Sequence, residues 1–220
     1  HAKLAPSAAA RWMNCPGSVA ACAVVPPGAP SEHAAQGTVA HMLCEKLVTG
    51  TLTDHALMGR VGDVVEEDGF DIAIDDEMVN AAILYRDAII TETEKMRGGR
   101  GRTPVVGKAE VRVYARAFDK ALYGTADYLL YQKGAVLKVV DFKYGKGVAV
   151  SPEENEQLTI YALAAMESEA GQAFDTIELI IVQPRAGGGA VRRWVGAGPG
   201  LWSTARAEAL ETGAQAEAAI

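Results

Sequence analysis

Two aspartates and a lysine form the pattern in this chain that is best suited to chemistry. Asp141 and Lys143 are two residues apart in an apolar run that is typical of a β-strand, so both side chains point to one face. Asp127 belongs to the preceding apolar segment, and a hairpin turn centred on Gly134 places it directly opposite Asp141. Opposed residues have Cβ atoms about 4.5–5.5 Å apart. Two carboxylates at that distance repel each other unless a cation lies between them.

This arrangement favours a site for a hard divalent metal ion. Mg²⁺ and Mn²⁺ prefer oxygen ligands, and a neighbouring lysine can orient water or stabilise charge that grows on a phosphate. The alternative is an exposed strand face with a cross-strand ion pair, and a one-residue slip would turn Asp127 to the other face. The apolar flanks at 129–130 and 139–140 favour the metal site, because they place the charges against a core element.

Other residues of suitable type surround this pair in the sequence. Glu110 lies on the preceding predicted strand, either as a surface acid or as a third acid of the site. Gln157 and Tyr161 are four residues apart, so they share one face of a predicted helix, although Tyr161 fits a core aromatic equally well. His41 and His33 lie on one stripe of an earlier predicted helix, where a histidine more often packs or faces solvent than binds metal.

The elements that must position these residues are predicted from periodicity and turn signals. Helices are expected first, then three strands, a helix, two strands and a last helix, which is typical of a mixed α/β or α+β domain. We expect a single domain over 1–220, with a mainly helical part over 1–100 and a sheet core over 104–195. Ser151 and Glu154 form a Ser-x-x-Glu capping box that predicts where the central helix starts. The predicted helices are 7–13, 31–48, 75–96, 151–170 and 201–219, and the predicted strands are 105–114, 122–131, 136–144, 176–183 and 190–195, with a loop or short hairpin over 51–74.

The composition excludes several classes of protein. With 220 residues, 49% hydrophobic and 22% charged, the chain fits a globular domain and not a disordered, collagenous or coiled-coil protein. No apolar run approaches the roughly 18 residues that span a bilayer, so no membrane association is expected. Three cysteines argue against a disulfide framework and favour the reducing cytoplasm.

Charge is unevenly distributed along the chain. The net charge of −7 by itself argues against nucleic-acid binding. However, residues 54–94 hold 12 acidic and two basic residues, whereas residues 95–120 hold eight basic and two acidic ones. This basic stripe either forms a phosphate-binding face or is a solvated loop and strand. Its candidate DNA-binding residues are Arg97, Arg100, Arg102, Lys108, Arg112 and Arg116.

Taken in order, these motifs carry a resemblance. The chain resembles the PD-(D/E)XK nuclease superfamily, in particular its RecB-like and lambda-exonuclease-like branch and a phage-associated family of uncharacterised nucleases within it. The resemblance covers about residues 7 to 165. It rests on Arg11-Trp12-x-x-Cys15-Pro16-Gly17-Ser18, His41, Glu110, Gly124-Thr125-Ala126-Asp127, Asp141-Phe142-Lys143-Tyr144-Gly145 and Gln157-x-x-x-Tyr161.

The resemblance implies a restriction-endonuclease-like core, in which a central mixed sheet is flanked by helices after an N-terminal helical region. It also implies that Asp127 and Asp141 bind one or two Mg²⁺ or Mn²⁺ ions, with help from the Phe142 carbonyl and His41. Glu110 would be a further metal ligand, a residue that contacts the ligands and not the metal, or neither.

The same resemblance assigns roles around the reacting phosphate. Lys143 would position the attacking water, and Gln157 and Tyr161 would hold Lys143 or a DNA phosphate. No iron–sulfur cluster is expected, because no cysteine follows Cys44.

The implied activity is that of a metal-dependent deoxyribonuclease, an exonuclease of phage or prophage DNA recombination or processing, in the cytoplasm of a bacterial host. DNA is the expected partner, together with a phage recombinase, an annealing protein or a helicase. Any unwinding must come from such a partner, because the chain has no Gly-x-x-x-x-Gly-Lys-Ser/Thr motif of its own. A homo-oligomer is compatible with the resemblance.

Two alternatives remain open at this point. One is a non-catalytic nucleic-acid-binding or scaffolding protein that retains the nuclease fold. The other is an unrelated enzyme whose nucleophile is Cys15 or Cys44, the latter three residues from His41 on one predicted helix. No aspartate or asparagine that would orient such a Cys–His pair is evident, and a buried structural cysteine is the commoner case.

Overall fold

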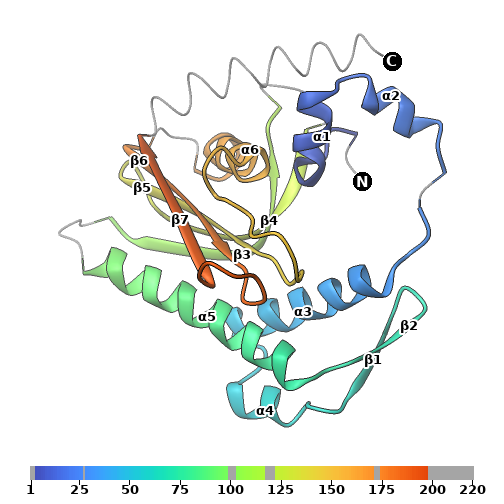
Figure 1. Ribbon diagram of the computed structural model, residues 1–220. Coiled ribbons are helices and arrows are strands. Elements are labelled where there is room, and N and C mark those ends of the chain that lie inside the picture. Colours follow the sequence, from blue (N-terminus) through green and yellow to red (C-terminus); the bar gives the residue numbers. More distant parts are fainter. Residues whose placement is uncertain (1–2, 27, 99–102, 117–121, 171–173, 198–220) are drawn as a thin grey trace.

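The computed structural model describes residues 3–26, 28–98, 103–116, 122–170 and 174–197. A five-stranded mixed sheet lies between two layers of helices, with α6 on one face and α3 and α5 on the other (Figure 1). This arrangement confirms the predicted mixed α/β class and the central sheet flanked by helices. No helix in the described part of the chain is both long and apolar enough to cross a membrane.

The elements follow the predicted order closely. The predicted C-terminal helix over 201–219 lies outside the described residues. The helical elements are η1 (Pro6–Ala8), α1 (Ala9–Asn14), α2 (Ser18–Ala23), α3 (Glu32–Val48), α4 (Asp54–Met58), α5 (Asp76–Arg97) and α6 (Glu156–Ala165), which continues as a π-helical turn at Met166–Ala170. The strands are β1 (Val64–Glu67), β2 (Phe70–Ala73), β3 (Val105–Tyr114), β4 (Tyr123–Gln132), β5 (Val136–Phe142), β6 (Thr176–Val182) and β7 (Val191–Ala197).

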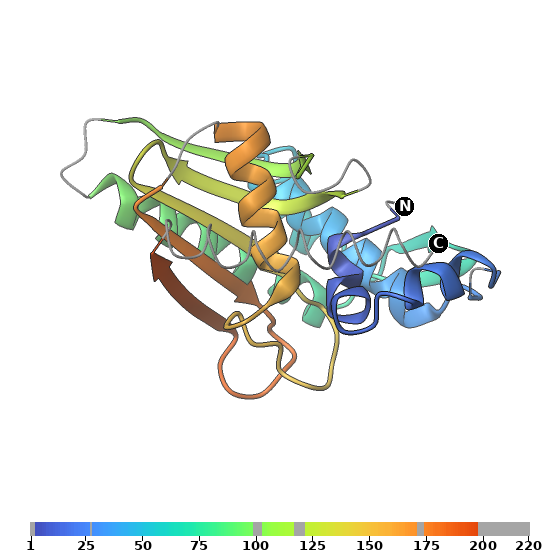
Figure 2. The same cartoon turned by 90° about the horizontal axis from the view of Figure 1, so that it is seen from above.

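The strands of the large sheet lie in the order β3-β4-β5-β6-β7. Only β5 and β6 are parallel, and α6 connects them across one face of the sheet, as the view from above shows (Figure 2). The β4–β5 hairpin pairs Gln132 with Val136, so its turn is centred on Gly134, as predicted. Gly134 has φ 77°, a left-handed conformation that glycine adopts without strain.

Strand β5 is apolar on both faces because helices cover both. Leu137 and Val139 belong to the core beneath α6, whereas Val140 and Phe142 belong to the core shared with α3 and α5. Alternation therefore places Asp141 on the α6 face of a strand that water does not reach from either side.

Two helix starts agree with the sequence and one does not. Ser31 and Asp75 cap α3 and α5 through their side chains, at the predicted starts of the helices over 31–48 and 75–96. The Ser151–Glu154 capping box is wrong, because Glu154 has a φ of 53°, which a continuous right-handed helix excludes. Helix α6 begins instead after Asn155, whose side chain accepts a hydrogen bond of 3.0 Å from the Leu158 amide.

A buried ionic network fastens α5 to the sheet. Glu92 of α5 accepts a hydrogen bond of 2.7 Å from Lys138 of β5, and it also pairs with Arg193 of β7. Lys138 lies 3.2 Å from Glu178 of β6, and Lys95 donates to Glu92 from the helix surface. Burial raises the pKa of Glu92, but the hydrogen bonds from Lys138 and Lys95 lower it more, and the net pKa shift is downward.

We expect Glu92→Gln to lower the free energy of unfolding by about 3 kcal/mol at pH 7, because removing one member of a buried ion network leaves cations uncompensated. The folded-state pKa of Glu92 lies below its unfolded value, so its stabilisation is present above the unfolded pKa and is lost as pH falls through the folded one. Urea unfolding at pH 7 and below about pH 4 checks both points. This role would be contradicted if the difference in unfolding free energy between wild type and variant did not shrink in acid. A similar loss of unfolding free energy in the exposed control Glu94→Gln would also contradict it.

Candidate metal centre

The carboxylates of Glu110 and Asp127 meet where the pairing of β3 and β4 is interrupted. Ala109 pairs with Tyr128 and Val111 pairs with Ala126, but the step between these pairs is missing from the ladder. Glu110 has a φ of 48° at this point, which breaks the regular strand geometry.

The face to which these acids point follows from their neighbours. Val111 and Ala126 pack in the core beneath α6. The carboxylates of Glu110 and Asp127 lie instead within 4.8 Å of a ligand atom of His41, which belongs to α3. Glu110 and Asp127 are therefore directed toward α3.

Helix α3 brings a histidine to this point of the sheet. One potential ligand atom from each of His41, Glu110 and Asp127 lies within 4.8 Å of the other two, and these residues are called the ligand trio below. His41 Nδ1 is 3.6 Å from Asp127 Oδ2, and the imidazole packs edge-on against the ring of Phe142 with centroids 5.2 Å apart. Because both residues lie beside Asp127, the structure favours a position at the site for His41 over a merely packed or solvent-facing histidine. It likewise favours a third acid of the site over a surface acid for Glu110.

Asp141 forms a second group with two other predicted residues, on the α6 side of β5. Lys143 Nζ lies 3.0 Å from Asp141 Oδ2 and donates a hydrogen bond of 3.0 Å to Gln157 Oε1. Gln157 Nε2 donates to Asp141 Oδ1 at 3.1 Å. Asp141, Lys143 and Gln157 therefore form a closed triangle, the lysine triangle, in which each side chain contacts the other two.

One backbone group joins the trio to the triangle. The amide of Phe142, next to Asp141, donates a hydrogen bond of 2.7 Å to Asp127 Oδ2. The ladder between β4 and β5 ends at Tyr128 and Val140, so the predicted cross-strand pair of Asp127 and Asp141 does not form, and this side-chain bond takes its place. The predicted role of the Phe142 carbonyl as a metal ligand stays a prediction.

Burial dominates the electrostatics of the acids. Burial, reinforced by the charge of Asp127, raises the pKa of Asp141 to about 7 and that of Glu110 to about 7. Burial also raises the pKa of Asp127 to about 6, against the opposing effects of the Phe142 amide and Lys143. Three acids whose ionised forms are disfavoured therefore share one small region.

A divalent cation fits these residues. Asp141 is 2% exposed, and its Oδ2 accepts no hydrogen bond of normal geometry, although the ammonium of Lys143 is near. Burial is the main cause that lowers the pKa of His41, so its neutral form, which binds metals, is favoured at neutral pH. The carboxylates with one imidazole suit Mg²⁺ or Mn²⁺.

Tyr161 is both a core aromatic residue and a neighbour of the site, the two interpretations that the sequence left open. It is 5% exposed in the core beneath α6, where burial raises the pKa of its phenol, and it shares a hydrogen bond with Gln157. A Cβ at Gly124 would lie 2.8 Å from the Tyr161 ring, so this strand position requires glycine. Tyr161 therefore supports the lysine triangle from behind.

Two arginines of the predicted basic stripe lie on or just after β3, the strand that carries Glu110. Arg112 stacks over the ring of Tyr123 at 4.3 Å, and Arg116 stacks over Tyr114 at 4.8 Å. Neither arginine is paired with a carboxylate among the residues that the structure describes. Lys108 is exposed on β3 and Arg97 ends α5, whereas Arg100 and Arg102 lie outside the described residues.

The structure disfavours Cys44 as a nucleophile, whereas the alternative of Cys15 stays untested. Cys44 is 2% exposed in the core between α3 and α5, and burial raises the pKa of its thiol well above the usual range. A protonated, inaccessible thiol is a poor nucleophile. Cys15 and Cys22 are exposed, and Cys22 Sγ accepts a contact from Arg11.

Two residues near the site were missed from the sequence. The Tyr85 hydroxyl is buried without a hydrogen-bond partner, and its ring packs against Phe142 at 5.3 Å. Gln183 accepts from the Val150 amide and donates to the Gly145 and Val148 carbonyls, which anchors the loop between Lys143 and α6. No local signal distinguishes either residue, because their partners lie far away in the chain.

Comparison with known families adds one finding. The family described as "Protein of unknown function (DUF2800)" matches residues 1–194. The chain belongs to this family. The DUF2800 match spans the ligand trio, the lysine triangle and all five strands of the large sheet except the end of β7.

We expect Mn²⁺ to raise the melting temperature of the protein, since a ligand that binds only the folded state stabilises it by about 2.7 kcal/mol at 100 times its Kd. Asp127→Asn and Asp141→Asn should abolish the rise, whereas the exposed control Asp71→Asn should retain it. The rise should be larger at pH 8 than at pH 5.5, because protons compete for acids whose pKa values are raised to about 6 and about 7.

The metal-free protein offers a second readout of the same site by thermal unfolding. The raised folded-state pKa of Asp141 means that its ionisation destabilises the fold above the unfolded pKa. Asp141→Asn should therefore be at least as stable as wild type at pH 8 without metal. A clear loss of stability there would argue for a purely structural carboxylate.

Proposed function

We propose that this protein is a metal-dependent deoxyribonuclease that hydrolyses phosphodiester bonds. The observation that carries the proposal is the lysine triangle, joined to the ligand trio by the hydrogen bond from the Phe142 amide to Asp127. An ammonium group held beside clustered, incompletely satisfied carboxylates is suited to a substrate with negative charge that grows during reaction.

The metal would be held by His41, Glu110 and Asp127 with the help of Asp141. When bound, Mg²⁺ or Mn²⁺ supplies Lewis-acid stabilisation of negative charge on phosphate oxygens. The remaining roles belong to the side chains of the chain itself.

Lys143 is the residue that would act on water and phosphate. Two of its three N–H donors are directed at Asp141 and Gln157, and its side chain is 30% exposed. The third donor is left to orient the attacking water or a phosphate oxygen. Gln157 fixes the ammonium, and Tyr161 fixes Gln157, so both are positioning residues.

The wider setting of the proposal rests on the resemblance to the PD-(D/E)XK superfamily. In this proposal the core is restriction-endonuclease-like, the enzyme is an exonuclease of phage or prophage recombination or DNA processing, and it works in the bacterial cytoplasm. A partner such as a helicase would supply any unwinding, a phage recombinase or annealing protein is the other expected partner, and a homo-oligomer is compatible with the proposal. Arg112 and Arg116 would contact the DNA backbone.

We expect linear DNA to be cleaved in the presence of Mg²⁺ or Mn²⁺ and not in EDTA. Asp141→Asn and Lys143→Ala should each reduce kcat by about 100-fold or more, since both remove charge stabilisation that preorganised groups provide. Lys146→Ala, an exposed lysine in the adjoining loop, is the matched control and should keep full activity. End-labelled linear DNA and closed circular DNA are compared, and cleavage of linear DNA alone identifies an exonuclease.

A folded wild-type protein that binds Mn²⁺ but cleaves neither substrate would overturn the enzymatic proposal. The alternative would then be a non-catalytic nucleic-acid-binding or scaffolding protein. Cleavage that persists in Lys143→Ala would instead remove the lysine triangle from the mechanism.

A further inference from the structure

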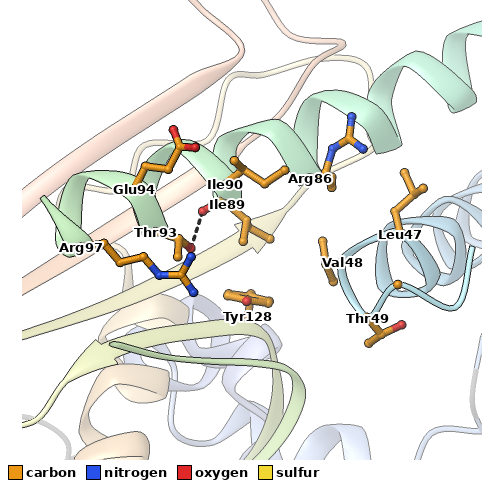
Figure 3. Close-up of a pocket in the computed structure, with 11 residues that line it drawn as sticks. Leu47, Val48, Thr49, Arg86, Ile89, Ile90, Thr93, Glu94, Arg97 and Tyr128 are labelled. Atoms are coloured by element: carbon orange, nitrogen blue, oxygen red, sulfur yellow. Dashed lines mark hydrogen bonds between the residues drawn. The ribbon is translucent and has the colours of Figure 1, made fainter. Parts of the chain in front are cut away.

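A groove opens between the C-terminal end of α3 and the second half of α5 (Figure 3). Its volume of about 400 Å³ is within the range of roughly 300–1,000 Å³ that is typical of small-ligand sites. The lining side chains used below are Leu47, Val48, Ile89, Ile90, Arg97 and Tyr128.

The groove continues from the ligand trio on the same side of the sheet. Tyr128, in its lining, directly follows Asp127 on β4. Val48 lies seven residues after His41 on α3, which is two helical turns along the same face and about 10 Å of axial rise. A chain molecule whose phosphate reaches the trio can therefore extend its next unit into the groove.

Its walls are mainly aliphatic, although Thr49, Thr93 and Glu94 add polar side chains, and one cation remains available among the described residues. Leu47, Val48, Ile89 and Ile90 supply the aliphatic lining. Arg86 also lines the groove, but it is paired with Asp54 and Asp87. Arg97 has no carboxylate partner within the described ranges, and its guanidinium points toward Tyr128 in Figure 3.

The aromatic ring in the lining is held in place by a glycine. A Cβ at Gly107 would lie 2.3 Å from the Tyr128 hydroxyl oxygen. The phenol can therefore cross β3 there only because residue 107 is a glycine. The Tyr128 side chain is half-buried and flanked by the α3 and α5 core. The groove thus combines a preorganised aromatic ring, aliphatic walls and an unpaired arginine.

We propose that this groove is a subsite for an unpaired nucleotide of the substrate strand, adjacent to the phosphate at the ligand trio. The base packs against Tyr128 and the aliphatic walls, and Arg97 pairs with a flanking phosphate. The inference rests on the proposed function and specifies its substrate, which is DNA with a single-stranded end and not blunt duplex.

The chemistry of the groove favours this occupant over simpler ones. A free phosphate would not need the aliphatic walls, and a neutral apolar ligand would leave Arg97 without a partner. Bases within a duplex stack on each other, so only an unpaired base offers its face to an aromatic side chain.

Three substitutions test the subsite. Ile90→Trp fills the groove from a position that is 45% exposed, Arg97→Gln removes the cation at an exposed helix end, and Gly107→Ala displaces Tyr128. The matched controls are Val64→Trp, at a position 60% exposed on β1, and Arg60→Gln, whose arginine pairs with Asp63. Melting temperatures verify that each variant is folded.

Affinity is measured by fluorescence anisotropy in EDTA, where no cleavage occurs, with a dye-labelled single-stranded oligodeoxynucleotide and a blunt hairpin duplex. Each groove variant should bind the single strand at least about fivefold more weakly, because stacking of one base on an aromatic side chain contributes about 1–3 kcal/mol. Duplex binding and both controls should stay at wild-type affinity.

Unchanged single-strand affinity in folded Ile90→Trp and Arg97→Gln would overturn the subsite. Equal losses for single strand and duplex would also overturn it, because the groove would then be part of a general electrostatic surface. The cleavage assay separates the two proposals. If the groove variants bind single strands more weakly but the wild type cleaves no DNA with metal, the subsite is supported and the nuclease proposal fails. If the wild type cleaves DNA and the groove variants bind as it does, the nuclease is supported and the subsite fails.

Discussion

The burial of negative charge on the central sheet is the constraint on which the candidate site depends. Helices cover both faces of β5, so Asp141 loses most of its hydration, and the neighbouring Asp127 and Glu110 are held close by the β3–β4 and β4–β5 pairing. Ionised carboxylates are costly in such a place unless a cation or several donors compensate them. The raised pKa values of all three acids express that incomplete compensation.

The opposite face of the same strand shows how this chain treats a buried charge that has only a structural role. Lys138, three residues before Asp141, is also buried, but carboxylates from α5 and β6 surround it and leave it fully paired. Asp141 keeps one oxygen without a hydrogen bond of normal geometry. Asp141 thus has one cation, Lys143 at 3.0 Å, whereas Lys138 has two carboxylates, and this less complete compensation is the reason why our proposal places Asp141 at the site.

The site is assembled from four separate elements around this strand. Helix α3 supplies the imidazole, the β3–β4 irregularity supplies two acids, β5 supplies Asp141 and leads into Lys143, and α6 supplies Gln157. Gln183 on the neighbouring strand anchors the loop that joins β5 to α6, so the geometry of the lysine triangle does not depend on local sequence alone. The groove beside Tyr128 opens on the α3 side, where the ligand trio also lies, whereas the lysine triangle approaches from the α6 side at the end of β5.

Local patterns were sufficient for the fold class, most strands, the helix starts at 31 and 75 and the hairpin register centred on Gly134, because alternation, helix caps and glycine turns act between neighbouring residues. Those patterns also selected Asp127, Asp141, Lys143 and Gln157 together. They failed at Ser151, where the left-handed backbone of Glu154 prevents a helix. They also could not find Tyr85, Gln183 or the groove at Tyr128, since contacts between distant segments create these features. Residue types and their local spacing thus identify the groups that can do chemistry, whereas the fold selects those that are desolvated side by side, because burial and long-range packing are properties of the folded chain.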